Sequence, residues 1–367
     1  MSTADVIVIG GGIAGISAAA ELAASARVVV LEAEDQPGYH TSGRSMAMFI
    51  LNYGNATLRA LNAVAQPVFL EPEGISDRSL LSPRGELMLA TEDELDTLET
   101  VLRESTGLQR VTATEAVSMI PILRPEPIAA GFYEANAQDI DVDRMLQGYT
   151  RLLKARGGEI RTNARVARMT RAGGTWHVET ANGVISAPVV INAAGAWADP
   201  VAGLAGAAHC SVQPMRRSVA VIPAPEDYHI DKWPLFGSVS ETWYAKAEAG
   251  RLLVSPADED PVEAHDAWAD DMVLAEGLHR FEQAVTMPVT RVERSWAGLR
   301  SFAPDRTPVV GFDARAEGFF WLAGQGGYGV QTAPALSKLT AALVMGHAPA
   351  IDKDTIAALS PARFNSN

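Results

Sequence analysis

The stretch "ADVIVIGGGIAGISAAAELAASARVVVLEAE", residues 4–34, decides the fold. Apolar runs at residues 6–9 and 28–31 predict two buried β-strands, and the alanine-rich residues 13–26 between them predict a helix. Gly10, Gly12 and Gly15 give the spacing G-x-G-x-x-G at the turn, where a pyrophosphate can approach the positive helix N-terminus. Glu32 ends the second strand, where an acid binds a ribose hydroxyl. The stretch therefore predicts a Rossmann-like unit that binds a dinucleotide.

Composition excludes several other classes of protein. The 367 residues suffice for two domains, and a net charge of −14 argues against a nucleic-acid partner. No apolar run reaches the ~20 residues that cross a bilayer, and no signal peptide is visible, so we expect no transmembrane segment and a cytoplasmic location. The single cysteine, Cys210, and seven histidines without ligand spacing predict no metal site.

The nucleotide-binding pattern continues in two later segments, residues 187–199 ("APVVINAAGAWAD") and 318–346, where a strand, a glycine-rich loop and a long helix follow one another. A cofactor-binding domain whose segments are separated in the sequence by inserted segments favours FAD over NAD. We therefore expect an α/β fold in which a Rossmann-like FAD-binding domain of the glutathione-reductase type is interleaved with a substrate domain built on a mixed or antiparallel sheet. The expected FAD-binding domain comprises residues 1–50, 146–211 and 301–367, and the substrate domain residues 51–145 and 212–300. Within the latter, helices are expected at 55–70, 92–105 and 266–285.

Arg300 is conspicuous because it lies among apolar residues in "SWAGLRSFAPDRTPVVG", residues 295–311. A guanidinium cannot lose its proton and is costly to bury alone, so a half-buried arginine needs an anion beside it. The residues alone leave two alternatives, a substrate carboxylate or a structural Asp or Glu.

The segments "VIGGGIAGISAAAELA", "PGYHTSGRS", "VINAAGAWAD", "WAGLRSF" and "AGQGGYGVQT" resemble the FAD-dependent D-amino acid oxidase and glycine oxidase superfamily. Within it the chain most resembles the D-arginine dehydrogenases, through "LLSPRGE", "PMRRS", "SPADEDPVEAHD" and "EGFFW". The resemblance covers nearly the whole chain. It implies non-covalent FAD, because Cys210 is not where relatives attach their flavin covalently.

The implied reaction is oxidative deamination of a small-molecule D-amino acid, basic or broad in type, to an imino acid that water hydrolyses to a 2-oxo acid and ammonia. The implied electron acceptor is a quinone or another carrier. Two alternatives stay open: an oxidase of the glycine or sarcosine type that uses oxygen, and an electron-transfer flavoprotein subunit without amine chemistry of its own.

The resemblance also implies roles for substrate-site residues. Arg300 and Arg217 would bind the substrate carboxylate, since a guanidinium holds a carboxylate by two parallel bonds. Tyr53 and Tyr244 would close over the substrate.

Three further positions concern the amine and the side chain. The carbonyl of Gly327 would accept a hydrogen bond from the amine, and Glu86 would receive a basic side chain. Met48 departs from the D-arginine dehydrogenases, for which the resemblance implies a polar histidine there, and favours apolar substrates such as D-Met or D-Phe.

The expected cofactor contacts come from the glycine turn, the segment after Glu32 and the two later pieces of the fold. The helix expected to start near Gln331 would direct its positive end at the flavin. The expected residues are Gly10, Gly12, Ile13, Ala14, Gly15, Glu32, Thr41, Ser42, Arg44, Ser45, Val166, Ala194, Gly195, Trp197, Gly326, Gly329, Val330, Gln331 and Thr332.

Overall fold

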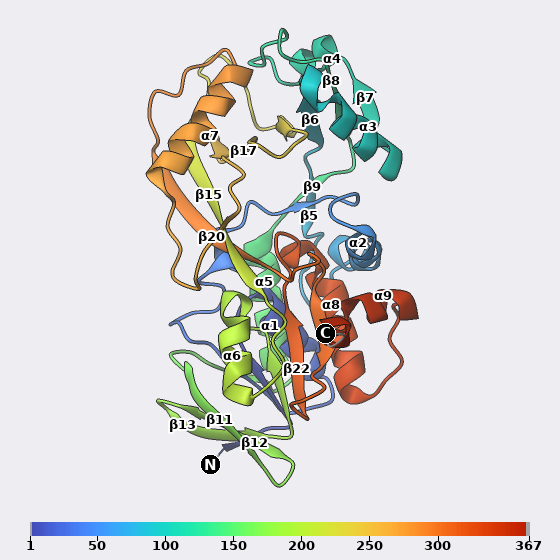
Figure 1. Cartoon of the computed structure of the whole chain (residues 1–367), viewed down its shortest axis with the longest axis vertical. Helices are drawn as coiled ribbons and strands as arrows, with labels where there is room; N and C mark the ends of the chain where they lie inside the picture. Colours follow the sequence, from blue (N-terminus) through green and yellow to red (C-terminus); the bar gives the residue numbers. More distant parts are fainter. Residues whose placement is uncertain (1, 365–367) are drawn as a thin grey trace.

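The computed structural model describes residues 2–364, so residues 1 and 365–367 of the expected FAD-binding domain lie outside the described residues. The molecule is elongated, with one part built on a parallel sheet and the other on a mixed sheet (Figure 1). Two long strands, β15 (Gln213–Pro223) and β20 (Arg294–Phe302), run between the parts.

The first part is built on a six-stranded sheet in the order β10-β3-β2-β14-β22-β21. Its neighbours pair in parallel except β21 with β22. All three separated segments of the sequence pattern supply strands to this sheet, which confirms the predicted interleaved α/β fold. The strands are β2 (Val6–Ile9), β3 (Val28–Leu31), β10 (Glu159–Arg161), β14 (Val189–Asn192), β21 (Val309–Phe312) and β22 (Phe319–Ala323).

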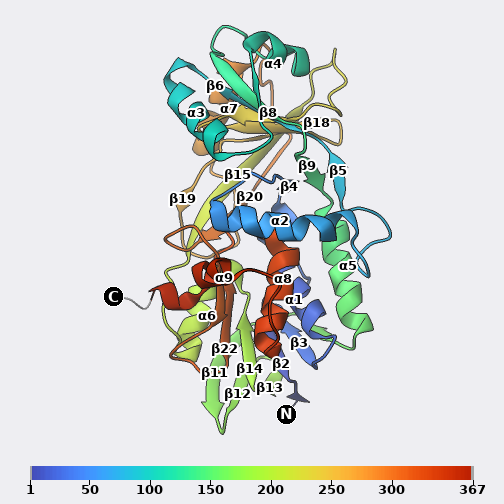
Figure 2. The ribbon, with the colours of Figure 1, turned by 90° about the vertical axis from the view of Figure 1, so that its right-hand side faces the viewer.

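Three helices pack side by side in this part: α1 (Ile13–Leu22), α5 (Val142–Ala155) and α8 (Gly329–Met345) (Figure 2). Helix α1 ends four residues earlier than expected. Ala24 and Ser25 donate to carbonyls only three residues back, which tightens the chain into a turn before β3. The alanine run carries no signal for this stop.

Helix α2 (Ala56–Leu70) lies in the range expected for the substrate domain, yet it packs across α8 (Figure 2). Its buried Leu58, Leu61 and Phe69 share one core with α1 and α8. A four-stranded sheet in the order β1-β13-β12-β11 completes the first part, with β1 (Ser2–Thr3), β11 (Val166–Ala172), β12 (Thr175–Thr180) and β13 (Gly183–Ala187), beside α6 (Ala198–Ala205) and α9 (Lys353–Leu359).

The second part has a mixed sheet in the order β19-β15-β18-β17-β16-β6-β8-β7, with β20 also paired to β15. Only β16 and β6 pair in parallel, so the predicted sheet type is confirmed. The remaining strands are β6 (Glu86–Ala90), β7 (Gln109–Val111), β8 (Ala130–Glu134), β16 (Leu235–Ser238), β17 (Tyr244–Glu248), β18 (Arg251–Ser255) and β19 (Asp260–Pro261). Its helices are α3 (Leu95–Glu104), α4 (Ala113–Met119) and α7 (Asp271–Ala284).

The pairing of β15 with β20 sets the spacing of two arginines. Arg217 lies opposite Gly298 and Arg300 lies opposite Met215 in an antiparallel register. Because side chains alternate between faces, Arg217 and Arg300 are diagonal neighbours on one face of this ladder. A small sheet of β4 (Met48–Phe49), β9 (Gln138–Ile140) and β5 (Leu81–Pro83) lies between the two parts.

Within residues 2–364 no helix combines the length and apolar character that a membrane span requires. The same residues contain no group of three or more His, Cys, Asp or Glu side chains arranged to hold a metal ion.

Candidate functional site

A cavity of about 410 Å³ opens at the carboxyl ends of β2, β3 and β14. This edge of a parallel sheet is where α/β proteins bind nucleotides. Seventeen of the expected cofactor contacts line the cavity or the one next to it; Gly15 and Thr332 line neither of the two.

The glycine turn forms one end of this cavity. Gly12 caps the N-terminus of α1 without any side-chain cap, and the amide of Gly11 donates to Glu32 Oε2 at 2.7 Å. Gly10 has φ +110°, and a Cβ there would lie 2.3 Å from the carbonyl oxygen of Ala193. Gly15 serves packing, since its Cβ would lie 2.0 Å from the Gly10 oxygen. The backbone of the glycine turn at the N-terminus of α1 therefore suits a pyrophosphate, and Glu32 offers an acceptor for a ribose.

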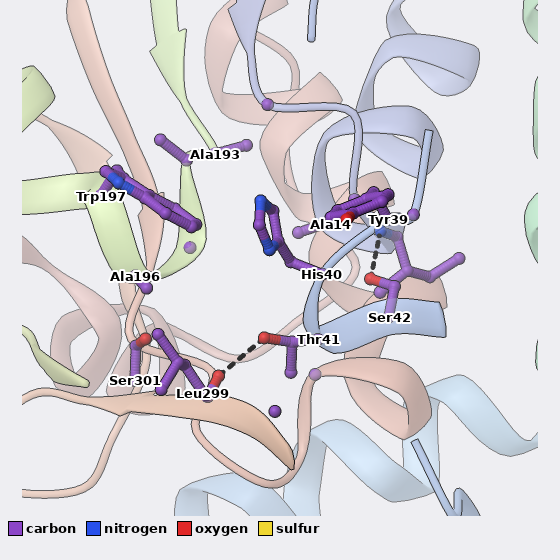
Figure 3. A pocket seen from close by; sticks show the side chains of 18 of the residues that line it. Ala14, Tyr39, His40, Thr41, Ser42, Ala193, Ala196, Trp197, Leu299 and Ser301 are labelled. Carbon is purple, nitrogen blue, oxygen red and sulfur yellow. Dashed lines mark hydrogen bonds between the residues drawn. The ribbon is translucent and has the colours of Figure 1, made fainter. Parts of the chain in front are cut away.

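The segment after β3 joins the two parts of the molecule along the cavity wall. Thr41 Oγ1 donates to the carbonyl of Leu299 at 2.8 Å, and Ser42 Oγ accepts from the amide of Ile13 at 3.0 Å (Figure 3). The Arg44 guanidinium donates to the carbonyls of Ala267 and Ala297 and pairs with Asp266. Thr41 and Arg44 thus have protein partners and fasten β20 against the cofactor side.

His40 also lines this cavity; it lies within the segment "PGYHTSGRS" but was not among the expected cofactor contacts. Its ring lies 4.6 Å from that of Trp197, between centroids, and its Nε2 is 3.1 Å from Glu34 Oε1 (Figure 3). A lone histidine without ligand spacing gives no signal that distinguishes it from a structural one.

The glycine-rich loop before α8 covers the far end of the cavity. Gly327 lies against Arg300, because a Cβ there would come within 2.9 Å of the Arg300 Nη1 atom. Helix α8 begins at Gly329, two residues before the expected start near Gln331. The Gln331 side chain donates to Asn62 at 3.0 Å and lines only the second cavity. Thr332 turns away, donating to the carbonyl of Tyr328 at 2.8 Å.

A second cavity, of about 340 Å³, adjoins the first. Seven residues line both and mark the junction: Ser45, Met46, Arg217, Tyr244, Arg300, Gly327 and Val330. The expected substrate residues Tyr53 and Glu86 line the second cavity, and so does Met48. All six residues expected at the substrate therefore meet at this junction or beyond it.

Arg300 lies at the junction without an ion-pair partner. Its Nη1 is 3.4 Å from the hydroxyl of Tyr53, and no carboxylate of the described residues forms an ion pair with it. Burial by itself lowers the pKa of Arg300, but the surrounding tyrosines and acids outweigh burial and raise it. The guanidinium is therefore charged and available to an anion.

Arg217 is more deeply buried and already has partners. Its Nε donates to the carbonyl of Asp258 at 2.8 Å and its Nη2 to Glu259 Oε1 at 2.9 Å. Its guanidinium also lies 5.9 Å from the centre of the Tyr244 ring. Burial raises the pKa of Tyr244, but the charges of Arg300 and Arg217 outweigh burial and lower it.

The far wall of the second cavity is acidic. Glu86 and Glu134 line it together with Glu104 and Glu241. Burial and the neighbouring Glu134 raise the pKa of Glu86 to about 8. Glu134 is buried and accepts from Asn52 Nδ2 at 2.9 Å. Sequence reasoning missed Glu134 and Glu241; the acid that ends the apolar run "AGFYE" was the available signal for the former.

Apolar side chains complete the second cavity. They are Met48, Ile50, Met88, Val101, Leu108, Phe132, Leu235 and Val239. The lining of the second cavity is therefore mostly apolar and includes several carboxyl groups.

Comparison with known proteins identifies the family. A family model described as "DAO: FAD dependent oxidoreductase" matches residues 5–343. The chain belongs to this family of FAD-dependent oxidoreductases. The match confirms the resemblance inferred from the sequence motifs, and with it FAD as the cofactor.

Individual relatives are distant in sequence. Glycine oxidase of Pseudomonas putida is 24% identical over 363 residues, which cover 95% of this chain and 96% of that protein. L-proline dehydrogenase from P. horikoshii has a TM-score of 0.86 and 20% identity, covering 99% of this chain and 98% of that one. L-alpha-glycerophosphate oxidase from Mycoplasma pneumoniae, solved with FAD bound, has a TM-score of 0.82 and 20% identity, covering 94% of this chain and 95% of that one. These solved structures share the fold.

The first cavity fits the chemistry of FAD. The glycine turn at the N-terminus of α1 suits the pyrophosphate and Glu32 suits a ribose, and the loop at Gly326–Gly329 lines the first cavity, with Gly327 lining the second as well. Two polar atoms of cavity-lining residues, Ser301 Oγ and Gln325 Nε2, have no hydrogen-bond partner among the described residues.

Proposed function

We propose that this protein is an FAD-dependent dehydrogenase that oxidatively deaminates D-amino acids, with basic side chains favoured. The proposal rests mainly on Arg300. Its charged guanidinium lies at the junction of the two cavities and has no ion-pair partner among the described residues. A carboxylate placed there would be held by charge-assisted bonds.

The residues around Arg300 would orient the rest of the substrate. Tyr53 and Tyr244 flank the guanidinium and present phenol groups to the bound carboxylate. The backbone of Gly327 borders both cavities, so its carbonyl can accept from the substrate amine. When bound, FAD supplies the acceptor for the two electrons and the α-hydrogen. The chain's own contribution is to hold the α-carbon in place and exclude water.

The second cavity supports a substrate that has a side chain. Its volume of about 340 Å³ exceeds what glycine needs, and Glu86 and Glu134 in its lining suit a cationic group once Glu86 has lost its proton. Met48 and the other apolar residues would accommodate the methylene stem of a basic side chain or the whole of an apolar one.

An oxidase of the glycine or sarcosine type is the second candidate, favoured by the similarity to glycine oxidase of Pseudomonas putida. Peroxide formation in air-saturated buffer separates the two, since a dehydrogenase passes its electrons to a quinone or another carrier. A flavoprotein subunit without amine chemistry is the third; an Arg300→Ala variant reduced by substrate as fast as the wild type would revive it.

The test of the proposal is an anaerobic titration of the purified holoprotein with D-arginine, L-arginine and D-methionine in parallel. We expect D-arginine to bleach the oxidised flavin band and L-arginine to leave it unchanged. Bleaching by D-methionine alone would keep the reaction and shift the preference to apolar substrates through Met48. No bleaching by any of the three would overturn the proposal.

A further inference from the structure

We propose that Glu259 is a positioning residue that neutralises Arg217 and so leaves the substrate carboxylate to Arg300. The inference rests on the proposed function, in which a carboxylate binds at the junction of the cavities. It concerns a residue that lines neither cavity and that acts through another side chain.

The two arginines on this face differ in their partners. Arg217 is 6% exposed, and its Nη2 donates to Glu259 Oε1 at 2.9 Å. Arg300 has Tyr53 as its hydrogen-bond partner, at 3.4 Å, and no ion pair within the described part of the chain. Because a guanidinium has five N–H donors, Arg217 keeps donors for the junction after its bonds to Glu259 and the Asp258 carbonyl. The charge of Arg217 is therefore compensated by Glu259, whereas the charge of Arg300 has no such partner.

Glu259 is itself held in place from the outside. Arg306 donates to both of its carboxylate oxygens at 3.0 Å, in the bidentate geometry that fixes orientation. Burial raises the pKa of Glu259, but Arg306 and Arg217 outweigh burial and lower it. The carboxylate is thus ionised and cannot easily swing away from Arg217.

The backbone next to Glu259 is also fixed. The carboxylate of Asp258 accepts from the amide of Ser218 at 2.6 Å and from its hydroxyl at 2.8 Å, which attaches this loop to β15. Asp258 also pairs with Arg216, whose side chain lies on the opposite face of the strand from Arg217. The carboxylates of Asp258 and Glu259 thus pair with arginines on opposite faces of β15, and Asp260 also pairs with Arg216, at 2.7 Å.

This arrangement predicts opposite effects of two charge changes. Glu259→Gln keeps an oxygen acceptor for Arg217 but removes the negative charge, so it should strengthen the binding of a carboxylate at the junction. Arg306→Gln removes the positive charge that partly neutralises Glu259. The negative charge of Glu259 then acts more strongly at the junction, so the variant should bind a carboxylate less tightly. A purely structural role of either residue would weaken binding in both variants.

The experiment measures propionate, an amino acid analogue without the amine, by its perturbation of the flavin absorbance of the holoprotein. We expect Glu259→Gln to lower the Kd by about three- to tenfold, and Arg306→Gln to raise it by about twofold because Arg306 is 46% exposed. Glu293→Gln is the matched control, because Glu293 is also held by two arginines, Arg251 and Arg291, but neither of these arginines lines a cavity, whereas Arg217 lines both.

The outcomes separate this inference from the proposed function. If wild type binds propionate, Arg300→Met abolishes binding, and Glu259→Gln leaves the Kd unchanged or higher, then the inference is wrong and the carboxylate site stands. An equal effect of Glu293→Gln would also overturn it, since only net charge would then matter. Wild-type protein that does not bind propionate would contradict both.

Discussion

Glu86 on β6 and Glu134 on β8 lie directly opposite each other in the antiparallel register. Like charges in directly opposed positions of two strands repel each other. The arrangement raises the pKa of Glu86 to about 8, through burial first and Glu134 second. Near neutral pH the Glu86 carboxyl therefore holds a proton that an ordinary glutamate would have lost.

Glu86 should lower the stability of the free protein at alkaline pH. In the unfolded chain Glu86 ionises near pH 4.5, whereas in the folded state it keeps its proton up to about pH 8. Stability contributed by this group is therefore present below about pH 4.5 and is lost as the pH rises to about 8. We expect Glu86→Gln to be more stable than wild type by about 1 to 3 kcal/mol at pH 8. Urea unfolding of both proteins at pH 5 and pH 8 measures the difference, and a difference independent of pH would contradict the assignment.

Substrate preference should change with pH for the same reason. A cationic side chain binds better to the carboxylate form of Glu86, so kcat/KM for D-arginine relative to D-methionine should rise between pH 6.5 and 8.5. Taking the ratio cancels the ionisation of the substrate amine, which both substrates share. Glu86→Gln should flatten this ratio, whereas a flat ratio in wild type would remove Glu86 from substrate recognition.

Arg300 should control substrate binding far more than stability. Arg300→Met removes the charge that we assign to the carboxylate, and we expect kcat/KM to fall by roughly a hundredfold or more. Flavin content and Tm serve as controls and should change little. Retention of kcat/KM within a few fold of wild type would show that the carboxylate binds elsewhere.

Gly327 should tolerate no side chain. A Cβ there would lie 2.9 Å from Arg300 Nη1, so Gly327→Ala should displace the guanidinium and raise KM by about tenfold. Gly203→Ala is the matched control, since it lies inside α6 with no atom within 4 Å of the added Cβ. It should leave KM unchanged and stabilise the protein by about 0.5 kcal/mol. Equal KM values for the two variants would mean that the loop moves freely away from Arg300.

FAD should dissociate from the polypeptide on denaturation. Cys210 is buried, burial raises the pKa of its thiol to about 12, and it lines neither cavity. A protonated thiol distant from the cofactor cannot attach a flavin. Acid precipitation should therefore release all flavin absorbance into the supernatant. A yellow pellet would contradict the prediction.

The sequence predicted much of the sheet and of the first cavity. The runs that became β2, β14 and β22 are short, apolar and soon followed by glycines, and the apolar run of β3 ends at an acid, so each carries its own local signal. The alternation of side chains along β15 places Arg216 and Arg217 on opposite faces, in agreement with their separate ion-pair partners.

The long-range partners could not be predicted in the same way. Glu259 meets Arg217 from a loop 42 residues later, and Glu134 meets Glu86 only through the pairing of β8 with β6. Nothing local distinguishes these acids from solvated ones. The packing of α2 on α8 was missed for a similar reason, because the apolar face of a helix does not specify which part of a molecule covers it.

The separated strands of the cofactor sheet have a consequence for the order in which the chain can fold. Val6 pairs with Val189 and Val190 pairs with Phe319, so the strands around the glycine turn come from the beginning, the middle and the last sixth of the chain. Bringing such distant strands together lowers the conformational entropy of the chain before the favourable energy of strand pairing is gained. A nascent chain that has not yet reached Phe319 lacks the neighbour of β14, so the FAD cavity is completed only after β22 and the loop that follows it have been synthesised.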